Sequence, residues 1–240
     1  MRIDYALHTH EAHSDYNPLT KSGSLTDYMR EPGSALTHLT GLIAAAAAAP
    51  GLLRHAAARG ADQLGLTGLL IFMLSMILLY GASTAYHTFD STDHINRVLK
   101  KIDHLMICVL IAGSYTPVCL TLLRGPVGYR LLAMVWGLAA AGMIFKLFFV
   151  FCPKWVSSVL YISMGWVCVI ALPQIVAVFS LTGFLWLLAG GLFYTIGGVI
   201  YALKFPVFHD RFRYFGSHEL FLVFVMAGSL CHYIVMYNYL

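Results

Sequence analysis

The stretch LGLTGLLIFMLSMILLYGASTAY, residues 64–86, decides the fold because it contains no charged residue. A helix that crosses the hydrocarbon core of a membrane needs about 20 consecutive, mainly apolar residues, and this stretch is long enough. Six more apolar runs, each bounded by charge, Pro or Gly, lie at residues 36–53, 104–123, 131–150, 156–179, 182–203 and 219–239. The sequence therefore predicts an all-α fold, a bundle of seven transmembrane helices.

The composition of the whole chain agrees with a membrane protein. Of 240 residues, 59% are hydrophobic and only 11% are charged, which excludes a soluble globular domain, a disordered chain and a coiled coil. The formal net charge of +4 is too dispersed for a phosphate-binding surface. Five cysteines lie inside or at the ends of apolar runs without CxxC spacing, so we expect free thiols. The expected partners are membrane lipids, with no nucleic acid.

The basic residues predict the orientation, since Lys and Arg accumulate on the cytoplasmic side of a membrane. With the N-terminus inside, nine of the basic residues near span ends fall in cytoplasmic segments and four in outside loops. We therefore expect a cytoplasmic N-terminus, an outside C-terminus and a multi-pass protein of the plasma (inner) membrane. Residues 1–35 are predicted to form a polar cytoplasmic tail, and residues 36–240 the membrane domain. The tail histidines His8, His10 and His13 are not expected to hold a metal, because ordering a flexible tail costs entropy.

Two prolines and one group of small residues predict features within the spans. Pro117 and Pro173 each remove a backbone donor, so we expect the third and fifth spans to be distorted there. The segment GGLFYTIGG, residues 190–198, is expected to let two helices approach closely.

Ionisable residues are costly inside a bilayer, so those near span ends are the candidates for function. Ser83 and His87 lie four residues apart, on one face near the end of the second span. Asp103 lies at the start of the third span and His218 at the start of the seventh. The predicted topology places them all in the same cytoplasmic layer. Two histidines and one carboxylate form a ligand set used by zinc, and non-haem iron uses a similar one. Each residue alone also fits a simpler role at the membrane interface, as a helix cap or a headgroup contact.

The motifs Ser83-x-x-x-His87, Asp103 before AGSYTP, and SHELF…GSLCHY from Ser217 to Tyr233 resemble those of the bacterial hemolysin III proteins. These are relatives of the progestin and adipoQ receptors, including the adiponectin receptors, and more distantly of the alkaline ceramidases. The resemblance covers residues 30–240. It implies seven helices, a cytoplasmic N-terminus and a zinc ion near the cytoplasmic face, bound by one histidine of span two and an HxxxH pair of span seven. An aspartate at the start of span three would hold water at the metal.

Carried over residue by residue, the resemblance makes His87 and His218 zinc ligands, with Ser83 beside His87 and Asp103 as the aspartate. The second histidine of HxxxH is absent, because Leu222 stands in its place. We expect Asp103 to complete the ligand set, or the affinity for zinc to be low.

Three functions remain open at this point. The first is a zinc-dependent intramembrane hydrolase of a lipid amide or ester, similar to a ceramidase, with Asp103 as general base or water holder and Ser83 supplying a supporting hydrogen bond. The second is a non-catalytic protein, receptor-like or active in membrane homeostasis, with a structural or degenerate metal site. The third is a haemolytic pore, which is disfavoured because no continuous charged stripe lines the spans. The sequence does not identify a substrate or an oligomeric state.

Overall fold

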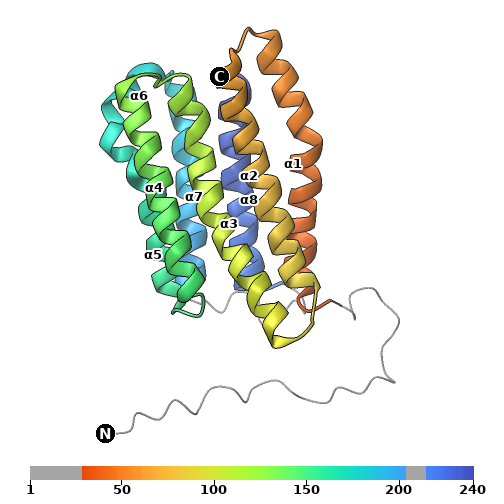
Figure 1. Cartoon of the computed structure of the whole chain (residues 1–240). Helices are drawn as coiled ribbons and strands as arrows, with labels where there is room; N and C mark the ends of the chain where they lie inside the picture. The colour runs from red at the N-terminus through yellow and green to blue at the C-terminus, as the bar shows by residue number, and fades with distance from the viewer. Residues whose placement is uncertain (1–28, 204–214) are drawn as a thin grey trace, which may run out of the picture.

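The computed structural model describes residues 29–203 and 215–240. Within those ranges all regular structure is helical, and seven helical segments are long and apolar enough to cross a membrane (Figure 1). The predicted all-α bundle of seven spans is therefore confirmed. The spans are α1 (Pro32–Ala58), α2 (Gln63–Thr88), α3 (Asp93–Leu120), α4 (Pro126–Phe148), α5 (Lys154–Gly165) continued by a 3₁₀ helix (Trp166–Ala171) and α6 (Leu172–Val178), α7 (Leu181–Leu203), and α8 (Ser217–Tyr239).

The first span is longer at both ends than the apolar run predicts. It begins at Pro32, because proline is tolerated in the first turn, where its missing N–H has no partner to lose. Pro50 lies inside the helix without ending it, and the helix continues to Ala58. The tail histidines His8, His10 and His13 lie outside the described residues.

The third span also begins earlier than predicted. Thr92 caps the helix, its side-chain oxygen accepting a hydrogen bond from the Ile95 amide at 3.4 Å. The first turns of α3 are polar and carry several basic residues, so an apolar run does not reveal them. Asp103 consequently lies inside the helix rather than at its start.

The prolines act differently in the two spans. α3 continues through Pro117 to Leu120. The fifth span is interrupted instead, because the 3₁₀ helix precedes α6, which has Pro173 in its first turn. The predicted distortion near Pro173 is therefore present, one turn ahead of the proline.

The seven spans form a ring. Consecutive spans pack together from α1 to α4, α5 packs on α7, α7 on α8, and α8 returns to α1. Small residues allow the closest approaches: a Cβ atom on Gly197 of α7 would lie 2.9 Å from the Phe224 Cβ of α8. The close approach predicted for residues 190–198 is thus found between α7 and α8.

The candidate residues gather at one end of the ring. Because α2 runs in the opposite direction to α1, α3 and α8, the end of α2 lies beside the starts of the other three helices (Figure 1). We call this the site end of the bundle. The last residue of the chain, Leu240, lies at the other end, after α8.

Candidate metal centre

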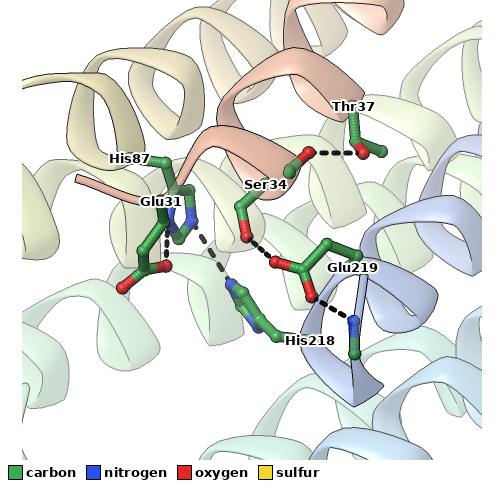
Figure 2. A network of polar contacts seen from close by, with 8 residues as sticks. Glu31, Ser34, Thr37, His87, His218 and Glu219 are labelled. Atoms are coloured by element: carbon green, nitrogen blue, oxygen red, sulfur yellow. Dashed lines mark hydrogen bonds and ion pairs between the residues drawn. The ribbon is translucent and has the colours of Figure 1, made fainter. Parts of the chain in front are cut away.

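Two histidines meet at the site end. His87 lies in the last turn of α2 and His218 in the first turn of α8, 131 positions later in the chain. Their Nε2 atoms are 3.3 Å apart (Figure 2). His87 is only 2% exposed and His218 is half-buried. The structure thus brings together, from two distant segments, the two imidazoles that the sequence places at one depth.

The separation of the two Nε2 atoms fits a shared zinc ion. Two nitrogens bound to tetrahedral zinc at about 2.0–2.1 Å lie about 3.3–3.4 Å from each other. An N–H···N hydrogen bond between the two rings would have a similar length. The position of the proton on each ring therefore has to be considered beside the distance. His87 Nδ1 is 2.7 Å from a carboxylate oxygen of Glu31, which can only accept. Neutral His87 therefore carries its proton on Nδ1 and directs the Nε2 lone pair toward His218.

Glu31 is the residue that sequence reasoning missed. It immediately precedes Pro32, and its backbone amide donates to the His87 carbonyl at 2.9 Å, which ties the start of α1 to the end of α2. The hydrogen bond from His87 is the largest cause that lowers the pKa of Glu31 to about 2. Glu31 is thus an anion that orients the His87 ring. The available signal was a carboxylate in the predicted cytoplasmic tail, five residues before the first predicted span.

Among the described residues, one group of ligand-type side chains is close enough together to hold a metal ion. One possible ligand atom from each of Glu31, His87 and His218 lies within 4.8 Å of the others. Asp103, predicted as the carboxylate of the site, is not part of this group. The residues that fit a metal most closely are therefore two histidines and a glutamate, with Asp103 farther away.

Asp103 and Ser83 lie together beside this group. The Asp103 carboxylate interacts with the hydroxyl of Ser83 and with the charge of His87. Ser83 is 1% exposed, and both side chains line the same cavity as His87 and His218. The pair predicted from sequence is therefore next to the histidines and open to the cavity.

Two residues near His218 have other roles. The Glu219 carboxylate accepts hydrogen bonds from the Ser34 hydroxyl at 2.5 Å and from the Gly216 amide at 2.8 Å (Figure 2). Both of its oxygens are thus used to cap α8 and to hold α1. Leu222, one turn after His218, is 3% exposed and lines the cavity with an apolar side chain.

The cavity has a volume of about 650 Å³ and is bordered by all the helices. His87, Asp103 and His218 line it at the site end, whereas Leu131 and Phe184 belong to its apolar remainder. A cavity of this size suits a ligand of drug or lipid-chain dimensions. The arrangement combines a polar, histidine-bearing end with a long apolar space.

Comparison with known proteins gives consistent matches. The family model described as "Haemolysin-III related" matches residues 26–233. A "Hemolysin-3 homolog" of Bacillus subtilis (strain 168) is 37% identical over 199 residues, which cover 83% of this chain and 89% of the relative. A "Hemolysin-3" of Bacillus cereus is 34% identical over 210 residues, which cover 87% of this chain and 91% of the relative.

Proposed function

Because the chain belongs to the haemolysin-III related family of multi-pass membrane proteins, we propose that it binds zinc between α2 and α8 and hydrolyses an amide or ester bond of a membrane lipid. The observation that carries the proposal is the 3.3 Å separation of the His87 and His218 Nε2 atoms at the polar end of a cavity of about 650 Å³.

The donor chemistry supports zinc. Imidazole nitrogens and carboxylate oxygens are common zinc ligands, and a site with few protein ligands keeps a position open for chemistry. A histidine ligand usually donates its second ring N–H to a carboxylate, which raises its basicity and fixes its orientation. Glu31 accepts such a bond from His87. His87 and His218 would therefore hold the ion, with Glu31 orienting His87.

The residues beside the histidines support hydrolysis. A zinc ion, when bound, supplies a Lewis acid that polarises a carbonyl group and makes water more acidic. Asp103 would accept the proton of the attacking water, and the Ser83 hydroxyl would hold the Asp103 carboxylate in place. The same carboxyl group would then return the proton to the leaving amine or alcohol.

The apolar part of the cavity supports a lipid substrate. Most of its lining is aliphatic or aromatic, and its ionisable groups are concentrated at the site end, with His232 farther along α8. A lipid chain would occupy the apolar part and place its carbonyl group at the histidines. Basic residues gather at the site end, and they favour the placement of this end on the cytoplasmic side of the membrane. They include Arg30, Arg97, Lys100, Lys101 and Lys154.

Metal analysis and lipid turnover test the proposal. Full-length protein, purified in detergent without chelator or histidine tag, should contain about one zinc ion per chain. Mass spectrometry should detect release of fatty acid from lipid amides or esters. Asp103→Asn should keep the zinc and reduce turnover by about 10²–10⁴-fold, the usual contribution of a general base. Equal turnover with and without zinc would contradict the proposal.

Leu222 favours a second candidate, a non-catalytic protein whose zinc is structural. With no histidine at position 222, the site lacks the second histidine of HxxxH. Hydrogen bonds at and beside the site also join α1, α2 and α8, as a structural metal would. For this function Leu222→His should raise zinc affinity and thermal stability together, and wild-type protein should show no lipid turnover.

A further inference from the structure

His38 of α1 is a buried histidine without an assigned role. It is 2% exposed, and among the described residues neither of its ring nitrogens has a hydrogen-bond partner. A buried polar group without a partner is costly, so its position calls for a ligand. His38 lines the same cavity as His87 and His218, and the charges of both act on its ring.

The packing of α1 on α8 fixes the depth of His38. Near the site end, Ser34 contacts Glu219, which is 185 positions later. Near the other end, Arg59 contacts Asn238, which is 179 positions later. The two helices therefore run parallel, with an offset of 185 positions near the site end and 179 at the other end.

This offset places His38 at the level of Leu222. His38 follows Ser34 by four residues and Leu222 follows Glu219 by three, so they lie about 6 Å and about 4.5 Å deeper than that contact. Side chains on a helix tilt toward its N-terminus, which for α1 and α8 is the site end. The His38 side chain thus leaves its helix tilted toward the site end.

The α2 side of His38 is consistent with this placement. The His38 ring packs against the Tyr80 ring, with centroids 5.1 Å apart. Tyr80 lies seven residues before His87 in α2, and the His87 side chain tilts away from the site end, toward the level of His38. The two imidazoles therefore border the same cavity, with about two turns of α2 between Tyr80 and His87.

We propose that His38 is the third imidazole ligand of the metal, occupying from α1 the position that Leu222 leaves vacant on α8. The inference rests on the proposed zinc site. His38 stands outside the group formed by Glu31, His87 and His218, so ligation requires a change of side-chain rotamer into the adjoining cavity. Its unpartnered nitrogens make that change favourable.

Zinc affinity of the full-length protein in detergent tests the inference by competition with a chromophoric chelator. His38→Ala and His38→Gln should both weaken zinc binding by more than about 100-fold, because losing even an outer partner of a ligand costs about 10–100-fold. Leu222→His in the His38→Ala background should restore the affinity. The matched control is His232→Ala, since His232 is also buried and lines the same cavity. It lies about 21 Å along α8 from His218, so its loss should leave the affinity unchanged.

X-ray absorption of the zinc-loaded protein provides a readout independent of activity and affinity. Imidazole scattering should correspond to three histidines in the wild type and two in His38→Ala. Wild-type affinity and three imidazoles in His38→Ala would overturn the inference while leaving the zinc site intact. Equal losses in His38→Ala and His232→Ala would also overturn it, because they would indicate a general effect on folding. A wild-type protein that binds no zinc would overturn the proposed function and this inference together.

Discussion

Removing the carboxylate of Glu31 should weaken the metal site without removing a histidine. A carboxylate oxygen of Glu31 lies 2.7 Å from His87 Nδ1, and the Glu31 side chain is 42% exposed. A hydrogen bond to a charged group contributes about 1.5–3 kcal/mol, and partial exposure screens it toward the lower value. About 1.5 kcal/mol corresponds to roughly a tenfold change in affinity. We therefore expect Glu31→Ala to bind zinc about tenfold more weakly, and Glu31→Gln, which keeps a neutral acceptor, to lose less.

Competition with a chromophoric zinc chelator at constant pH measures this difference. Glu219→Gln is the matched control, because Glu219 lies in the same layer but bonds Ser34 and the Gly216 amide instead of an imidazole. It should retain the wild-type affinity. Glu31→Ala with wild-type affinity would refute the assignment of Glu31 as the group that orients His87. A loss far above 100-fold would place its carboxylate in direct contact with the metal.

Two further predictions concern helix packing and the end of the bundle opposite the site. A Cβ atom on Gly68 would lie 2.9 Å from the Pro117 Cα of the neighbouring helix, so Gly68→Ala should destabilise the protein by about 1–3 kcal/mol. Gly137→Ala, which meets nothing within 4 Å, should not; equal thermal unfolding of the two variants would contradict this reasoning. The hydrogen bond from Arg124, followed by that from a backbone amide, lowers the pKa of Asp62 from 3.8 to about 2. Asp62 therefore stabilises the fold above pH 3.8 and loses this effect as the pH falls through about 2. In this pH range the unfolding temperature should change less steeply with pH in Asp62→Asn than in the wild type.

The number of spans could be predicted from sequence, but the ends of some helices could not. Apolar runs determine where a chain can cross a membrane, and all seven lie within the helices of the structure or extend only a few residues past their ends. The start of α3 was missed because residues 93–103 are mainly polar and leave no apolar run to detect. The start of α1 was missed because Pro32 was counted with the polar tail. Hydropathy identifies the part of a helix that lies in lipid. It does not identify helical turns that extend beyond the membrane.

The depth of the site residues along their helices could be predicted from the sequence. The contacts between helices that bring these residues together could not. Counting residues from the ends of spans puts His87, Asp103 and His218 in one layer, since each residue advances a helix by about 1.5 Å. Which helices are neighbours across the ring depends on how the side chains of distant segments pack. The pairing of Glu31 with His87 requires α1 to lie against α2 at that end, which no local pattern specifies.

The three carboxylates near the histidines have separate tasks, and this division makes the proposed chemistry testable in parts. Glu219 has both oxygens bonded to Ser34 and the α8 cap, so it is committed to holding helices together. Glu31 has an oxygen on the His87 ring, so its loss should act on metal affinity. Asp103 interacts with the Ser83 hydroxyl and faces the cavity, where a lipid carbonyl would lie. Proton transfer is therefore left to Asp103, and Asp103→Asn should separate turnover from metal binding, whereas Glu31→Ala should reduce both together.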